Sequence, residues 1–206
     1  MSGADRVRLR GWFNQAAELY DRARPGYLPA LFDELAGVAG VGPGCRVLEI
    51  GCGTGQATVP LAERDCRIVA VELGAAMAAV ARRNLARFPA VEVAVAAFQD
   101  WPLPPEPFDV VVAATAWHWL DPAVRVAKAA AALRPGGTLA TVATHHVAGG
   151  DAVGSAQCGR AGWGVHLERR RGSLPRAQLR SVHLLSRRRP SSRSCGWCRP
   201  RSWRWR

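Results

Sequence analysis

Apolar and polar positions divide the first 150 residues into alternating helix-like and strand-like segments. A stripe of apolar residues with helical spacing runs through 28–39, at Leu28, Leu31, Leu35 and Val38. Short, almost continuous apolar runs predict five strands, at residues 46–50, 67–72, 91–96, 109–114 and 138–144. The segments between them predict helices at about 56–63, 75–87 and 121–133. Asp121 and Pro122 suit the start of the last helix, as N-cap and first helical residue.

Strands that are apolar along their whole length belong to sheets buried on both faces. Helices between consecutive strands supply the covering layers, and the crossovers between parallel strands are right-handed. The predicted fold class is therefore α/β, with a Rossmann-like doubly wound parallel sheet.

A glycine-rich loop follows the first predicted strand, with the spacing acid-x-G-x-G-x-G from Glu49 to Gly55. Glycine accepts positive φ and lets the backbone approach a ligand, and the next helix offers free N–H groups to an anionic group. A nicotinamide-binding loop needs G-x-G-x-x-G, and Gln56 or Thr58 stands where its third small residue belongs. The spacing therefore disfavours a dinucleotide.

An acid, Glu72, ends the second predicted strand, 17 residues beyond Gly55. In a Rossmann-like sheet, an acid at that strand end faces the ribose hydroxyls of a bound nucleoside. The alternative is a solvated acid at the start of a helix. The combination of Glu72 with the glycine loop favours the ribose-binding role.

Four segments resemble successive motifs of the class I methyltransferases, which use S-adenosylmethionine. They are Val-Leu-Glu-Ile-Gly-Cys-Gly-Thr-Gly (47–55), Val-Glu-Leu (71–73), Phe-Gln-Asp-Trp-Pro-Leu (98–103) and Leu-Arg-Pro-Gly-Gly-Thr-Leu (133–139). The run from Phe13 to Tyr27 and the segment Ala116-Trp117-His118-Trp119 are similar to the small-molecule, trans-aconitate-methyltransferase-like branch (methyltransferase type 11). The resemblance covers residues 12–148 and does not extend to the C-terminal part.

The resemblance implies S-adenosylmethionine as the cofactor, with the glycines and Glu49 at its methionine end and Glu72 at its ribose. The residues implied in cofactor binding are Glu49, Gly51, Gly53, Gly55, Glu72, Leu73, Met77, Phe98, Gln99 and Ala114. The candidate substrate-binding residues are Tyr20, Arg24, Tyr27 and Trp117. Arg24 and Tyr27 suit a substrate carboxylate, or they are solvated residues of a lid. Helix 12–22 would form part of that lid.

The expected reaction is methyl transfer to a small-molecule carboxylate or hydroxyl. Positioning supplies most of the rate when the leaving group is already good. A carboxylate needs no base, but a hydroxyl does, and His118 is the candidate catalytic residue. The alternative for His118 is a structural role between Trp117 and Trp119. The adjacent His145 and His146 point to opposite faces of a strand, so we expect no metal site.

Charge separates the C-terminal segment from the rest of the chain. Residues 1–150 carry 14 basic and 14 acidic residues, whereas residues 151–206 carry 14 Arg and two acids, so the whole excess of +12 lies there. The expected divisions are 1–40 as N-terminal lid helices, 41–150 as the cofactor-binding core and 151–206 as an Arg-, Ser- and Trp-rich tail. This tail offers no clear strand period, so we expect the core to lack the final strand pair usual in the family.

Two interpretations of residues 151–206 compete. A basic tail rich in Arg and Trp suits RNA or DNA, whereas 27 Arg against one Lys indicate a GC-rich gene, whose out-of-frame translation gives such a composition. We favour the frameshift, which would leave an impaired enzyme or an inactive fragment that keeps the fold. Nucleic acid remains a partner only through this tail.

The sequence has no apolar run long enough to span a membrane and no secretory signal at its N-terminus. We therefore expect a cytoplasmic protein with reduced thiols and no membrane partner.

Overall fold

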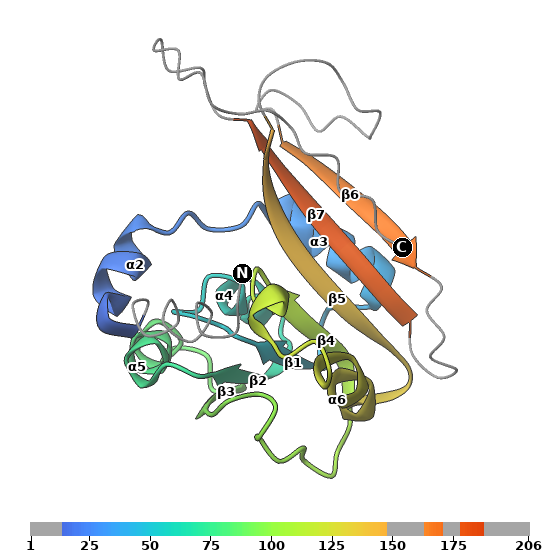
Figure 1. Ribbon diagram of the computed structural model, residues 1–206, viewed down its shortest axis with the longest axis horizontal. Coiled ribbons are helices and arrows are strands. Elements are labelled where there is room, and N and C mark those ends of the chain that lie inside the picture. The colour runs from blue at the N-terminus through green and yellow to red at the C-terminus, as the bar shows by residue number, and fades with distance from the viewer. Residues whose placement is uncertain (1–13, 148–162, 171–177, 188–206) are drawn as a thin grey trace.

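The computed structural model describes residues 14–147, 163–170 and 178–187 (Figure 1). The elements in chain order are α2 (Ala17–Ala23), α3 (Pro29–Ala39), β1 (Arg46–Ile50), α4 (Thr58–Ala62), β2 (Arg67–Glu72), α5 (Ala75–Asn84), β3 (Val91–Val95), β4 (Phe108–Ala114), the 3-10 helix η1 (Trp117–Trp119), α6 (Arg125–Ala132), β5 (Leu133–Val147), β6 (Trp163–Arg170) and β7 (Gln178–Arg187). The longest described helix, α3, has 11 residues, and none of the described helices meets the length and hydrophobicity that a membrane span requires.

The strands form one sheet in the order β3-β2-β1-β4-β5-β7-β6. Strands β1 to β5 pair in parallel, which confirms the doubly wound sheet predicted from the apolar runs. The chain moves from β1 outward to β3 and then returns to the other side of β1 with β4. The strand order therefore reverses between β1 and β4, the place where open α/β sheets bind ligands.

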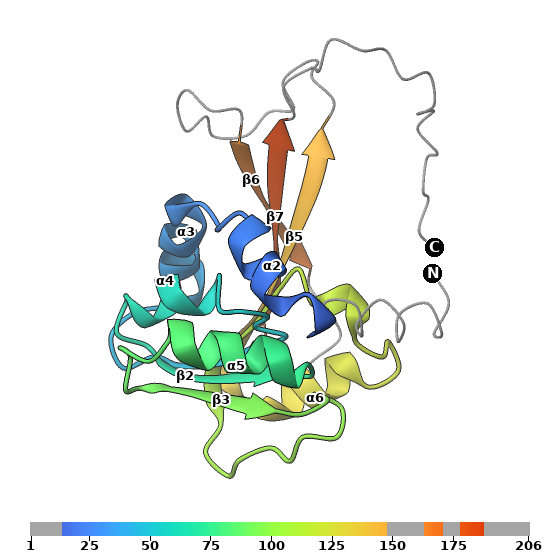
Figure 2. The ribbon, with the colours of Figure 1, turned by 90° about the vertical axis from the view of Figure 1, so that its left-hand side faces the viewer.

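Two apolar cores cover the sheet, one on each face. Neighbouring residues of β1 show this, since Val47 packs in one core and Leu48 in the other, and both are fully buried. Helices α3, α4 and α5 close the first core, as Leu31 and Leu61 illustrate. Helix α6 and the segment 97–103 close the second (Figure 2). The continuous apolar runs of the sequence follow from this burial on both sides.

The last predicted helix begins later than its sequence indicates. The Asp121 carboxylate accepts a hydrogen bond from the backbone N–H of Ala123 at 2.9 Å, and its carbonyl accepts one from the Arg125 N–H at 3.0 Å. Val124 has a φ of −113°, outside helical values, so α6 starts at Arg125. Asp121 thus makes the hydrogen bonds expected of the predicted N-cap, although the regular helix begins only after the turn at 122–124.

The chain has a final strand pair, contrary to the expectation that it lacks one. Strand β7 pairs in parallel with β5, and β6 pairs antiparallel with β7. Figure 2 shows these three strands extending beyond the layer formed by the other strands. Strand addition uses the backbone N–H and C=O groups along the edge of β5, so a weak side-chain period does not prevent it. The predicted boundary at 150 and the other segments of 151–206, including Cys158, Cys195 and Cys198, lie outside the described residues.

Candidate functional site

A cavity of about 640 Å³ opens at the carboxyl ends of β1, β2 and β4, where the strand order reverses. This volume lies within the usual range for small-molecule sites. The residues predicted from sequence that line it are Tyr20, Arg24, Tyr27, Glu49, Gly51, Gly53, Glu72, Leu73, Met77, Phe98, Gln99, Ala114 and His118. Thr115 and Ala116, which belong to the segment 114–117 that the resemblance places near the methyl group, also line it, and residues that line it without having been predicted include Cys52, Gln56, Trp119 and Leu120.

The glycine loop turns sharply between β1 and α4. Gly51 has a φ of 70°, and its N–H donates to the Val71 carbonyl at 2.7 Å, which holds the loop against β2. A Cβ atom at this position would lie 2.6 Å from the Cβ of Ala116, closer than real Cβ contacts. Glycine is therefore required here twice, once for the backbone conformation and once for the space.

Gly55, predicted to contact the cofactor, is not among the residues that line the cavity. It is buried with a φ of 100°, and a Cβ there would contact the side chain of Leu85 at 3.5 Å. Its role is close packing of the loop against α5. The sequence spacing of the three glycines could not separate this packing position from the two that face the cavity.

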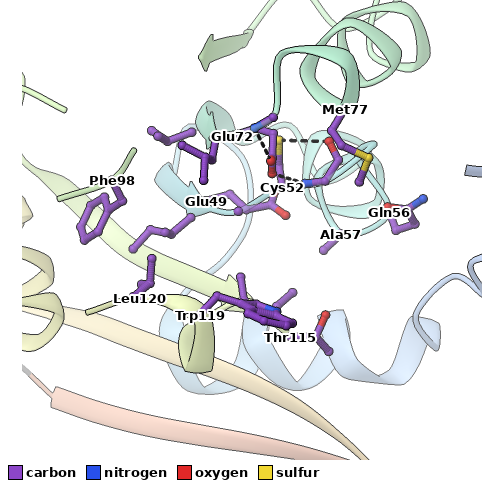
Figure 3. Close-up of a pocket in the computed structure, with 18 of the residues that line it drawn as sticks. Glu49, Cys52, Gln56, Ala57, Glu72, Met77, Phe98, Thr115, Trp119 and Leu120 are labelled. Atoms are coloured by element: carbon purple, nitrogen blue, oxygen red, sulfur yellow. Dashed lines mark hydrogen bonds between the residues drawn. The ribbon is translucent and has the colours of Figure 1, made fainter. Parts of the chain in front are cut away.

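The Glu72 carboxylate links the glycine loop to the start of α5. Oε2 accepts a hydrogen bond from the Gly53 N–H at 2.9 Å, and Oε1 accepts one from the Gly74 N–H at 2.8 Å. Figure 3 shows both bonds and the carboxylate at the cavity wall. These two bonds fix the orientation of the carboxylate at the cavity wall.

Glu49 lies within the cavity wall, between β1 and the layer of helices. It is 1% exposed, and its Oε2 has no hydrogen-bond partner among the described residues. Burial raises its pKa to about 7, with the Thr58 hydroxyl acting against this and the Glu72 charge adding to it. An unpartnered buried carboxyl is costly unless a ligand supplies a donor or a positive charge.

A polar cluster lies on the opposite side of the cavity, around Thr115. Its hydroxyl accepts a hydrogen bond from Arg24 Nη2 at 2.9 Å and bonds to the Tyr27 hydroxyl at 3.0 Å. Thr115 has a φ of 54°, which is unfavourable for a β-branched residue. Such strain persists where neighbouring contacts fix it, often at functional sites. The resemblance placed Thr115 near the methyl group, but nothing in the sequence indicated its contacts with Arg24 and Tyr27.

Helix α2 covers this side of the site because polar and apolar contacts fix it to α5. Asp21 Oδ1 accepts from Asn84 Nδ2 at 3.0 Å, and Glu18 forms an ion pair of 2.8 Å with Arg83. Tyr20 packs on the small apolar cluster that includes Met77. The N-terminal run thus lies beside the glycine loop, although some 30 residues separate them in sequence.

The Trp-His-Trp segment presents a different tryptophan from the one predicted. Trp117 packs on the second core, and its carbonyl accepts a hydrogen bond from Arg125 Nη1 at 2.8 Å, so it does not line the cavity. Trp119 lines it instead (Figure 3), because the two residues lie in a 3-10 turn that points their side chains in different directions. The His118 ring lies 4.7 Å from the Trp119 ring. Partial burial and the charge of Arg125 lower the pKa of His118.

No group of three or more His, Cys, Asp or Glu side chains within the described ranges is arranged to hold a metal ion.

Comparison with known proteins gives one consistent result. The family model of the methyltransferase domain matches residues 47–137. An uncharacterised methyltransferase of Mycobacterium tuberculosis is 38% identical over 130 residues, which cover 63% of this chain and 51% of that protein. The malonyl-[acyl-carrier protein] O-methyltransferase of Geobacter sulfurreducens is 37% identical over 125 residues, covering 56% of this chain and 45% of that protein. The chain thus spans about half the length of these curated relatives.

A solved structure shares the fold. A Haemonchus contortus phosphoethanolamine N-methyltransferase, in complex with phosphomonomethylethanolamine and S-adenosylhomocysteine, superposes with a TM-score of 0.54 at 22% identity, covering 66% of this chain and 34% of that one. The matched family domain runs from β1 into β5 and contains both the glycine loop and Glu72. Residues 47–137 therefore carry a methyltransferase domain, and the described sheet has the fold of the class I, S-adenosylmethionine-dependent type.

Proposed function

We propose that this protein binds S-adenosylmethionine in the cavity and transfers its methyl group to a carboxylate or hydroxyl of a small molecule. The observation that carries the proposal is Glu72, whose carboxylate is fixed by the Gly53 and Gly74 N–H groups at the carboxyl end of β2. From there it faces the cavity beside the glycine loop and can accept hydrogen bonds from ribose hydroxyls.

The charges around the cavity favour a cationic cofactor. Glu49 and Glu72 both line the same wall, and Glu49 has an oxygen without a partner among the described residues. A dinucleotide would bring its pyrophosphate against these two acids, whereas S-adenosylmethionine carries an ammonium and a sulfonium. The arrangement fits this cofactor, with the ammonium near Glu49 and the ribose on Glu72.

The two ends of the cavity differ in character, which orients the cofactor. Phe98 and Leu120 lie at one end, and Gln56 and Met77 lie at the other (Figure 3). Phe98 is buried and suits the flat face of an adenine, with Gln99 beside it to meet the ring edge. The methionine part of the cofactor then extends along Gly51 and Gly53 toward Gln56.

When bound, S-adenosylmethionine supplies a methyl group on a sulfonium that leaves readily. The chain has to align the acceptor with this group and keep water out. Residues 114–116 approach Gly51 at the middle of the cavity, and α2 and Trp119 cover it. Alignment alone contributes up to roughly 7–11 kcal/mol in favourable intramolecular reactions. Helix α2 is thus the proposed cover of the site.

An oxygen acceptor fits the polar side of the cavity. Arg24, Tyr27 and the Thr115 hydroxyl form a connected cluster that can orient a carboxylate. A hydroxyl acceptor requires a base, and the lowered pKa of His118 keeps its imidazole neutral and able to take a proton at neutral pH. The Geobacter relative, an O-methyltransferase by name, supports oxygen as the acceptor atom.

A transfer assay tests this function. The purified chain is incubated with S-adenosylmethionine and single members of a panel of small carboxylic acids, phenols and amines, and formation of S-adenosylhomocysteine is measured. We expect turnover with one or more oxygen acceptors. Turnover restricted to amines would contradict the proposed acceptor chemistry, and the absence of turnover with a cofactor that binds would contradict the small-molecule reaction.

A further inference from the structure

Two buried cysteines face each other at the edge of the sheet opposite the cavity. Cys45 immediately precedes β1 and Cys66 immediately precedes β2. The cavity opens at the carboxyl ends of these strands, so the length of a five-residue strand, about 16 Å, separates the two places. The thiols are free, and neither residue lines the cavity.

The strand register places the two side chains on the same face. Arg46 pairs with Arg67 in the parallel ladder, and the Arg67 N–H donates to the Cys45 carbonyl at 2.9 Å, so the pairing continues to the two cysteines. Both belong to the first core, together with Val47. Neighbouring strands lie about 4.8 Å apart, within the Cα separation of about 4.4–6.8 Å that a disulfide spans.

The surroundings make one thiol the better nucleophile. The neighbouring Cys45 thiol lowers the pKa of Cys66 against the effect of burial. The contact of Cys66 Sγ with the Gly42 carbonyl at 3.5 Å and the Arg64 charge add to this lowering, and the Asp65 charge opposes it. The neighbouring Cys66 thiol, burial and the Asp109 charge raise the pKa of Cys45. Cys66 is therefore the thiol of the pair that ionises first, and attack by a thiolate next to a second thiol is the route by which oxidation proceeds to a disulfide.

We propose that Cys45 and Cys66 are a redox-active pair that forms a reversible disulfide when the protein meets a small two-electron oxidant such as hydrogen peroxide. The Cys66 thiolate attacks one peroxide oxygen, the O–O bond breaks, and the hydroxide that leaves takes up the proton released by Cys66 to form water. The Cys45 sulfur then attacks the resulting sulfenic acid. The S–O bond breaks, and a second water leaves with the Cys45 proton. The two thiols lose two electrons, which reduce one peroxide to two waters.

Burial restricts the reaction to small oxidants. Cys66 is 1% exposed and Cys45 is 8% exposed, so a bulky disulfide such as oxidised glutathione cannot reach either sulfur in the folded protein, and hydrogen peroxide reaches them through local opening of the structure. The disulfide links the amino-terminal ends of β1 and β2. The glycine loop and Glu72 lie at the carboxyl ends of the same strands, so the disulfide does not contact them.

Peptide mapping tests the pair in the folded protein. The full chain is treated with hydrogen peroxide, its remaining thiols are blocked with N-ethylmaleimide, and it is digested with trypsin. Because trypsin does not cut between Arg24 and Pro25, the cysteines fall on separate peptides: Cys45 on 23–46, Cys52 on 47–64 and Cys66 on 65–67. We expect a species of 23–46 joined to 65–67, two hydrogen masses below the sum, which dithiothreitol separates.

Cys45→Ser and Cys66→Ser serve as matched variants, since each removes one partner and keeps a side chain of similar size. The joined species should disappear in both, and the oxidised wild-type protein should melt at a higher temperature than either variant treated in the same way. Blocked thiols on 23–46 and 65–67 after peroxide treatment, or joining of either peptide to 47–64, would overturn the proposal. This result is independent of methyl transfer, because it requires neither cofactor nor acceptor.

Discussion

Replacing Glu72 with alanine tests the proposed ribose site at its centre. The change removes the acceptor that faces the cavity and also the two hydrogen bonds to the Gly53 and Gly74 N–H groups. A hydrogen bond to a charged group contributes about 1.5–3 kcal/mol when buried, and Glu72 is only partly buried, so we expect about 1–3 kcal/mol of lost binding free energy. This corresponds to a rise of about 5- to 150-fold in the dissociation constant of S-adenosylhomocysteine.

Part of that loss reflects the loosened glycine loop, so a thermodynamic cycle isolates the ribose contact. Adenosine and 2′,3′-dideoxyadenosine are titrated calorimetrically into the wild-type protein and into Glu72→Ala. We expect the wild-type protein to lose about 1–3 kcal/mol when the hydroxyls are absent, and the variant to lose much less. The difference is the coupling between the carboxylate and the hydroxyls.

Glu63→Ala is the matched control. Glu63 is a half-exposed acid that pairs with Arg87 at the surface, so its loss should change binding by less than about 0.5 kcal/mol. An equal loss on removing the hydroxyls in the wild-type protein and in Glu72→Ala would show that Glu72 does not contact the ribose, and it would refute the reasoning from geometry.

Three further predictions concern other parts of the site. The pKa of Glu49 in the folded protein is raised to about 7, so between pH 4.5 and 7 the folded protein binds a proton that the unfolded chain has lost. As the pH rises through this window, the free energy of unfolding should fall by about 3 kcal/mol more in the wild-type protein than in Glu49→Gln, as measured by urea unfolding. Parallel curves for the two proteins would exclude this. Gly51→Ala should lower the unfolding free energy by about 1–3 kcal/mol, with partial recovery on adding Ala116→Gly, and thermal melts without any loss would contradict the contact of 2.6 Å. Thr115→Val should cost about 1–2 kcal/mol because Arg24 and Tyr27 lose their shared partner, whereas Thr115→Ser should cost less; the opposite order in denaturant unfolding would show that the hydroxyl is unimportant.

The sequence predicted the sheet well where burial on both faces leaves a continuous apolar run. Strands 46–50 and 67–72 have the observed bounds, because a turn residue or a charged residue ends each run. The sequence also predicted that the glycine loop and Glu72 lie close together, because parallel strands bring their carboxyl ends to one edge of the sheet.

The sequence pattern does not determine the orientations of individual side chains in the site. Trp117 and Trp119 are two residues apart in a 3-10 turn, and only the turn decides which one faces the cavity. Gly55 shares the spacing of the other glycines but packs on Leu85. Thr115 adopts a positive φ that no sequence rule assigns to threonine. Strands β6 and β7 depend on backbone pairing along an edge, which leaves little trace in the side-chain pattern.

Calorimetric titration with S-adenosylhomocysteine, compared with NAD under the same conditions, tests the central claim most directly. We expect one S-adenosylhomocysteine bound per chain, with a matching rise in melting temperature, and no binding of NAD at comparable concentration. Absence of heat and of a thermal shift with S-adenosylhomocysteine, or preferential binding of NAD, would contradict the assignment of the cavity to a methyl donor.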